Sequence, residues 1–81
     1  MKAPTFPGVL RTITVKKDVT DLQGWKIRKG LVIHVMKEGP VPPKGSKFRK
    51  ILVVRVDNGF EDLKMFPETA VYADDVEGGQ P

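Results

Sequence analysis

The chain has 81 residues, of which 40% are hydrophobic and 30% charged, and its formal net charge is +4. This length suits one domain with one core, and it leaves little room for a deep active-site cleft. The chain contains no cysteine, which excludes disulfides, thiolate metal sites, iron–sulfur clusters and cysteine nucleophiles.

The charged residues are unevenly distributed along the chain. Residues 1–56 contain 13 basic and 3 acidic groups, whereas residues 57–81 contain 1 basic and 7 acidic groups. An asymmetric field of this kind steers an anionic partner to one side of a small domain. No apolar run has the length of a signal peptide or approaches the roughly 18 residues of a membrane span. We therefore expect a soluble, cytoplasmic protein with no membrane partner.

The first half of the chain predicts two strands separated by a polar loop. Residues 1–8 contain two prolines and a glycine, which favour an extended lead-in. Residues 9–17 alternate between apolar and polar side chains and are rich in Ile, Val and Thr, a pattern typical of a strand. Residues 17–24 are polar and predict a loop that folds back over the core. Residues 25–37 predict the second strand, with its regular part beginning near Leu31.

The second half predicts a loop, a hairpin, a helical turn and a last strand. Residues 38–46 contain three prolines and two glycines, so they cannot form a central strand. The first half of residues 47–66 is the longest β-branched and aliphatic run, and the Asp57-Asn58-Gly59 sequence that follows predicts a tight hairpin turn into a second strand at residues 60–66. Residues 67–70 begin with proline and predict one helical turn. Residues 71–76 predict a short last strand.

These elements predict an all-β domain over residues 9–76, followed by a flexible tail over residues 77–81. Five strands, a long first loop and one helical turn before the last strand match a small SH3-like barrel. An oligonucleotide-binding barrel is the main rival, but that fold usually has a longer helix between its third and fourth strands. The predicted tight turn occupies the place where such a helix belongs.

The residues that support catalysis are few and do not converge. His34 is the single histidine, and a lone histidine on a strand is typical of a structural side chain. Asp74 and Asp75 are adjacent, as are Glu61 and Asp62, so on strands each pair points to opposite faces. Acid–base and metal chemistry both require several groups that meet at one point. We therefore predict a protein that is not an enzyme and has no catalytic residues, metal or cofactor.

A set of basic residues is the strongest indication of a binding surface. On strands, Lys26 and Arg28 share one face, and Lys47 and Arg49 share another. Pairing of the flanking strands brings both groups near the proline-rich loop, and such a patch neutralises phosphates. The alternative is a solvated strand edge whose lysines discourage aggregation. The set consists of Lys26, Arg28, Lys29, Lys44, Lys47, Arg49 and Lys50.

Two aromatic residues lie among these cations. Trp25 and Phe48 are placed to stack on bases, as the aromatic side chains of single-strand binders do. Packing in the core is the more economical interpretation for both rings in so small a protein. Residues 37–43 also fit the spacing of a polyproline ligand, although a loop between strands accounts for the same prolines.

The layout resembles SH3-like barrel accessory proteins. The resemblance depends on Ile13-Thr14-Val15, on Asp21-Leu22-Gln23-Gly24 and on residues 52–76, which end in MFPETAVYADDV. Similar arrangements occur in KOW-type and Tudor-type modules and in small barrel subunits that help ferredoxin dock, such as the variable chain of ferredoxin-thioredoxin reductase. The resemblance implies a fold whose members bind nucleic acid, peptides or larger complexes, mostly without catalysis.

The leading hypothesis is a small binding module whose basic face engages nucleic acid or a nucleoprotein complex. The competing hypothesis is a docking or regulatory subunit that binds an acidic surface of a larger protein complex, and the sequence leaves the oligomeric state open. The residues predicted to bind are Trp25, Lys26, Arg28, Lys29, Lys44, Lys47, Arg49 and Lys50.

Overall fold

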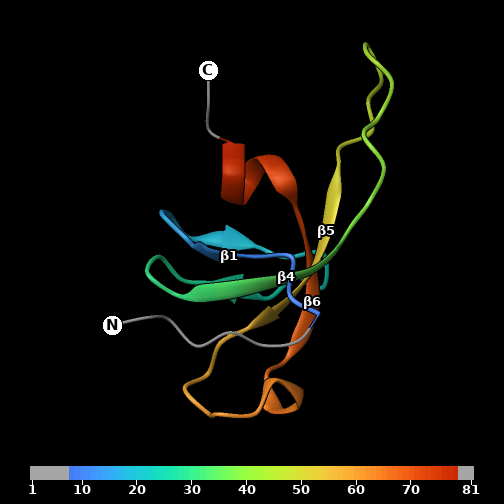
Figure 1. Ribbon diagram of the computed structural model, residues 1–81. Helices are drawn as coiled ribbons and strands as arrows, with labels where there is room; N and C mark the ends of the chain where they lie inside the picture. The colour runs from blue at the N-terminus through green and yellow to red at the C-terminus, as the bar shows by residue number, and fades with distance from the viewer. Residues whose placement is uncertain (1–7, 79–81) are drawn as a thin grey trace.

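The computed structural model describes residues 8–78, so the lead-in predicted for residues 1–7 and the tail at residues 79–81 lie outside the described residues. Four antiparallel strands form the main sheet in the order β1-β4-β5-β6 (Figure 1). The alternating sequence explains why burial alternates along β1, β5 and β6, whereas β4 buries three consecutive residues, Ile33, His34 and Val35. Their bounds are β1 Arg11–Thr14, β4 Val32–Glu38, β5 Ile51–Val56 and β6 Glu68–Tyr72.

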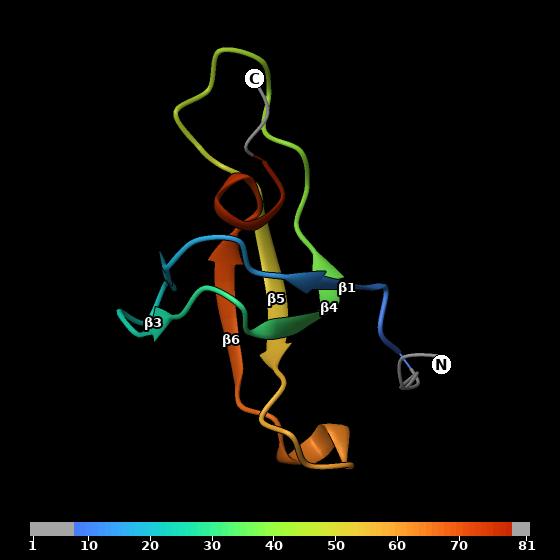
Figure 2. The ribbon, with the colours of Figure 1, turned by 90° about the vertical axis from the view of Figure 1, so that its left-hand side faces the viewer.

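A second, two-stranded sheet is formed by β2 Val19–Thr20 and β3 Lys26–Ile27. The loop predicted for residues 17–24 therefore contains a short strand. The Leu22 N–H donates to the Ala70 carbonyl at 2.9 Å, which attaches this hairpin to the edge strand β6. Figure 2 shows the hairpin beside the main sheet.

Both sheets contribute to one aliphatic core. Burial of apolar surface is the main favourable term in folding, and a cluster this small depends on every member. The described strands form two separate hydrogen-bonded sheets, so the fold is all-β as predicted. The core cluster consists of Val15, Val19, Ile27, Ile33, Val35, Leu52, Val54, Val71 and Ala73.

The connection between β4 and β5 is the longest loop of the described chain. The register of the two strands shifts between Val35 and Lys37, which indicates a bulge near the end of β4. Beyond it, the Gly39 N–H donates to the Ile51 carbonyl at 2.8 Å and closes the base of the loop. Residues 39–50 then project away from the sheet (Figure 1). The prediction that strand structure resumes at residue 47 is wrong, because β5 begins at Ile51.

The tight turn predicted at Asp57-Asn58-Gly59 is also wrong, because β5 pairs with β6 and not with residues 60–66. Asx side chains explain the difference, since they satisfy the backbone locally. Asp57 Oδ1 accepts from the Gly59 N–H at 2.8 Å, and the Asn58 side-chain amide donates to the Met65 carbonyl at 2.9 Å. These bonds fold residues 57–67 into a closed loop.

The helical turn before the last strand exists, but it lies at η1 Leu63–Met65 and not at residues 67–70. Those later residues enter β6, where Thr69 and Val71 are buried and pair with Val54 and Leu52 of β5. The chain then forms a π-helical turn, η2 Asp74–Gly78, where the sequence predicted strand and tail. The last strand therefore begins three residues earlier and ends four residues earlier than the sequence predicted.

Candidate binding surfaces

His34 is a buried structural residue. Its side chain is 3% exposed and bonds to the Thr12 hydroxyl at 3.1 Å and to the Asp57 carboxylate at 3.0 Å. Its ring stacks on Phe66 with 5.4 Å between centroids. The pKa of Asp57 is lowered by the Gly59 backbone N–H and then by His34. The group therefore fastens β4 to β1 and to the loop that follows β5.

Residues 8–78 contain no group of three or more His, Cys, Asp or Glu side chains that could hold a metal ion. Among the same residues, no helix has the length and apolar character needed to cross a membrane.

The structure divides the predicted basic set into two groups. Lys26, Arg28 and Lys29 belong to the β2–β3 hairpin and the turn that follows it, whereas Lys44, Lys47, Arg49 and Lys50 belong to the β4–β5 loop. Figure 2 shows the β2–β3 hairpin at the height of β4, whereas the β4–β5 loop lies above the N-terminal end of β5. The structure therefore separates the predicted cations into two groups and does not form the single patch that the sequence predicts.

The first surface lies where two connections meet. The Val15 N–H donates to the Leu31 carbonyl at 2.8 Å, and the Gly30 N–H donates to the Val15 carbonyl at 2.7 Å. The Lys29 N–H donates to Asp18 at 2.9 Å. Residues 15–18 and 28–31 are thereby held side by side. We call the exposed residues Lys16, Lys17, Trp25, Lys26, Arg28 and Lys29 the hairpin surface.

Trp25 is on the outside of the protein. It is 56% exposed, so the core interpretation is wrong for this ring. Hydrogen bonds to buried Asp21 fix its backbone, because the Asp21 carboxylate accepts from the Trp25 N–H at 2.8 Å and from the Gln23 N–H at 2.9 Å. The Thr69 hydroxyl donates to the same carboxylate at 2.7 Å. The ring is therefore presented to solvent by a rigid turn.

Sequence reasoning missed Lys16 and Lys17. They lie two and three residues beyond the end of β1, and the bonds of Val15 to Gly30 and Leu31 and of Asp18 to Lys29 hold their segment beside residues 28–31. One signal was available in the sequence. Two adjacent lysines at the end of a predicted strand leave the sheet together, so at least one faces outward.

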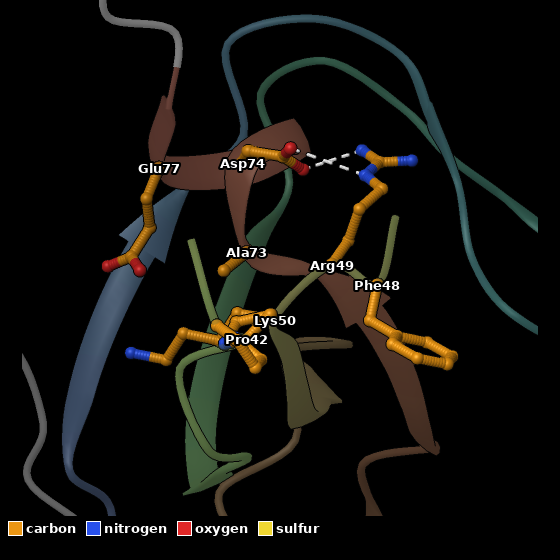
Figure 3. A pocket seen from close by; sticks show the side chains of 8 residues that line it. Pro42, Phe48, Arg49, Lys50, Ala73, Asp74 and Glu77 are labelled. Atoms are coloured by element: carbon orange, nitrogen blue, oxygen red, sulfur yellow. Dashed lines mark hydrogen bonds and ion pairs between the residues drawn. The ribbon is translucent and has the colours of Figure 1, made fainter. Parts of the chain in front are cut away.

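The second surface is the projecting β4–β5 loop. Phe48 is 80% exposed and Val41 is 77% exposed, so the core interpretation is wrong for Phe48 too. The prediction that Lys47 and Arg49 share a strand face also fails, because both lie in the loop. Figure 3 shows the side chains of Phe48 and Arg49 extending in opposite directions on one side of a pocket that Pro42 also lines. We call residues Val41, Lys44, Lys47, Phe48, Arg49 and Ile51 the loop surface.

Arg49 is neutralised by the chain itself. Its guanidinium bonds to both carboxylate oxygens of Asp74 (Figure 3), bonds to Asp75 at 2.8 Å, and lies 4.0 Å from the centre of the Tyr72 ring. The prediction that Asp74 and Asp75 point apart is wrong, because both lie on the η2 turn and not on a strand. The Arg49 guanidinium lowers the pKa of Asp74.

A second ion-pair network lies at the base of the loop. Glu38 pairs with Lys50 at 2.7 Å and with Arg11 at 3.0 Å, and Glu77 pairs with Arg11 at 2.7 Å. Arg11 and then Lys50 lower the pKa of Glu38 to about 2. Arg11, Arg49 and Lys50 are thus already paired with carboxylates, whereas Lys44 and Lys47 form no ion pair with a described residue.

Comparison with known protein families, curated proteins and solved structures gives no match to this chain.

Proposed function

We propose that this protein is a non-enzymatic binding module that engages single-stranded nucleic acid through the hairpin surface. The observation that supports the proposal is Trp25, an exposed ring on a rigid turn of the hairpin surface, whose other five residues are exposed cations. None of these five side chains forms an ion pair with a described carboxylate. Unpaired cations attract phosphates, and an exposed ring stacks on an unpaired base.

Each part of the surface has a distinct task in this proposal. Lys16, Lys17, Lys26 and Arg28 contact successive phosphates and release their counterions, which makes binding depend on salt. Trp25 stacks on one base, an interaction that tolerates any sequence because every base has a π-face. The strand is bound along its backbone with little sequence preference.

We also propose that the two sheets are the halves of an open SH3-like barrel. Two observations support this arrangement. The hairpin residues Val19 and Ile27 share one core with β4, β5 and β6, and the Leu22 N–H bonds to the edge of β6. A barrel of this kind places short hairpins and loops at the rim, where partners are bound.

The test is a titration of a fluorescently labelled oligothymidine of about 15 nucleotides, a length at the upper end of the site sizes of small single-strand-binding domains. Wild-type protein is compared with Lys26→Ala/Arg28→Ala, and with the charge-matched control Lys37→Ala/Lys64→Ala on β4 and η1. Loss of two phosphate contacts is expected to weaken binding at least about tenfold and to reduce the salt slope by about 1.4. The control is expected to change binding less than about threefold.

Trp25 supplies an independent readout, because it is the single tryptophan of the chain. Stacking on a base is expected to quench its fluorescence, and Trp25→Ala is expected to cost about 1–3 kcal/mol of binding free energy. The proposal fails if wild-type protein does not bind the oligonucleotide at about 50 mM salt. It also fails if the hairpin and control variants lose affinity equally.

A further inference from the structure

The loop surface differs in chemistry from the hairpin surface. A groove of about 380 Å³ lies along the loop, and its lining is apolar except for Arg49. Solitary exposed apolar residues are ordinary, but a contiguous apolar patch along a projecting loop is typical of an interaction site. The lining residues are Gly39, Pro40, Val41, Pro42, Pro43, Phe48, Arg49 and Ile51.

We propose that this groove is a second, separate docking site, and that its occupant is a peptide segment of a partner protein that combines bulky apolar side chains with carboxylates. This inference does not depend on nucleic-acid binding by the hairpin surface. Only the role of an adapter, with one surface for a nucleic acid and another for a protein, rests on the function proposed for the hairpin surface.

The groove is largely preformed. Pro40, Pro42 and Pro43 have fixed φ angles, which limits the conformations open to that side of the loop. The Gly39–Ile51 backbone bond closes the base, and Arg49 fastens the returning side to Asp74 and to the Tyr72 ring. A preformed site loses less conformational entropy on binding, which favours affinity for a short peptide.

The lining favours a peptide over a nucleobase. Sites for single strands supply stacked rings and free cations along a backbone path. This groove offers one ring, Phe48, beside proline and aliphatic side chains. The charged lining residue, Arg49, is already bonded to Asp74 and Asp75. Apolar side chains of a peptide are the groups that match such walls.

Charge complementarity indicates an acidic peptide. Lys44 and Lys47 lie between the lining residues Pro43 and Phe48, and both are exposed without an ion pair to a described residue. We place them at the rim of the groove because each adjoins a lining residue in the sequence, and rim cations speed the approach of acidic partners. The same cations disfavour a second copy of this loop, because lysine would face lysine.

The experiment selects ligands from a random-peptide phage library on the immobilised full chain and measures synthetic copies of the selected peptides by fluorescence polarisation. The loop variants are Val41→Ser/Phe48→Ser and Lys44→Glu/Lys47→Glu. All four residues are exposed, so the fold is expected to persist. The matched control on the hairpin surface is Lys26→Glu/Arg28→Glu.

The selected peptides are expected to contain at least one carboxylate beside a bulky apolar residue. Each loop variant is expected to weaken their binding at least about tenfold, as removal of interface anchors does, while the hairpin control changes it less than about threefold. Selection without such a consensus, or peptide binding that survives both loop variants, overturns the proposal.

Two other occupants are tested with the same variants. If Val41→Ser/Phe48→Ser abolishes oligothymidine binding, the loop serves nucleic acid and the docking proposal is wrong. If sedimentation shows a wild-type dimer that this variant dissociates, the groove belongs to a second copy and the proposal is wrong as well. Failure of the hairpin surface to bind oligothymidine affects the proposed nucleic-acid function alone, because the peptide measurement is independent of it.

Discussion

At the scale of single residues, buried Asp21 organises the turn that presents Trp25. Its carboxylate accepts three hydrogen bonds, two from backbone N–H groups and one from the Thr69 hydroxyl. Asp21→Ala leaves these donors without a partner, so we expect a loss of about 3 kcal/mol in the free energy of unfolding. Urea unfolding at pH 7 measures this value.

Asp18→Ala is the matched control for that substitution. The Asp18 carboxylate is exposed and accepts a single backbone bond, from Lys29. Its removal is therefore expected to cost about 1 kcal/mol or less. Equal losses in the two variants contradict the role assigned to Asp21.

The exposure of Trp25 and Phe48 could not be predicted from their hydrophobicity. Aliphatic residues, together with Phe66 on the His34 ring, already fill the interior. Trp25 is turned outward because its backbone N–H is bonded to Asp21, and Phe48 lies in the loop before β5 begins. Large side chains are often exposed where a surface has a partner, so residue type alone does not decide burial.

At the scale of elements, the regular part of the sequence predicted the structure well. The alternation near residues 9–17 and after Leu31 gave β1 and β4, and the β-branched run gave β5. The prolines of residues 38–46 correctly predicted a loop. These signals succeed because strand periodicity follows directly from burial of one face of a sheet.

The prediction failed where side chains bond to nearby backbone. The Asp57 side chain bonds to Gly59 and the Asn58 side chain bonds to Met65. The sequence predicted a tight hairpin turn at this point, but residues 57–67 form a loop of eleven residues between β5 and β6. Ion pairs between distant residues could not be predicted either, because the pairing of β5 with β6 is what brings Arg49 close to Asp74. No local pattern encodes a contact across 25 residues of sequence.

Gly39 gives a prediction for the base of the β4–β5 loop. A Cβ at this position lies 3.0 Å from the Ile51 carbonyl oxygen, the acceptor of the Gly39 N–H itself. Gly39→Ala therefore requires the Ile51 carbonyl to move by a few tenths of an ångström, and we expect a loss of about 1 kcal/mol in the free energy of unfolding. Amide hydrogen exchange of residue 39 is expected to accelerate in the variant.

Val41→Ala is the control for the base of the loop. Val41 is exposed beyond this base, so its truncation is expected to change stability by less than about 0.5 kcal/mol. If amide exchange at residue 39 is unchanged in Gly39→Ala, the added Cβ does not weaken the Gly39–Ile51 hydrogen bond and the prediction is wrong.

At the scale of the whole molecule, folding places part of the acidic C-terminal third against cations of the basic two-thirds. Asp74, Asp75 and Glu77 of η2 meet Arg49 and Arg11. Figure 1 shows η2 near the base of the projecting loop. The carboxylates of η2 thus neutralise Arg11 and Arg49. The cations of the hairpin surface, and Lys44 and Lys47 of the loop, form no ion pair with a described residue. Net charge alone does not describe such a surface.

The same networks predict how stability depends on pH. Hydrogen bonds from Arg11 and Arg49 lower the pKa values of Glu38, Asp74 and Glu77 in the folded protein, that of Glu38 to about 2. A carboxylate with a lowered folded pKa contributes stability above its unfolded pKa, near 4, and loses it as the pH falls through the folded value. Urea unfolding is therefore expected to show a declining free energy between pH about 4.5 and 2.

Glu38→Gln separates this network from the general effect of acid. The variant lacks the titrating group, so its stability is expected to fall below that of the wild type at pH 7 and to approach it near pH 2, where the wild-type carboxylate becomes protonated. Glu61→Gln is the charge-matched control, because Glu61 forms no hydrogen bond or ion pair with a described residue. If both variants follow the wild-type profile at a constant offset, Glu38 does not link folding to protonation. A profile that converges for Glu38→Gln alone shows that the carboxylate between Arg11 and Lys50 holds the base of the loop against β1.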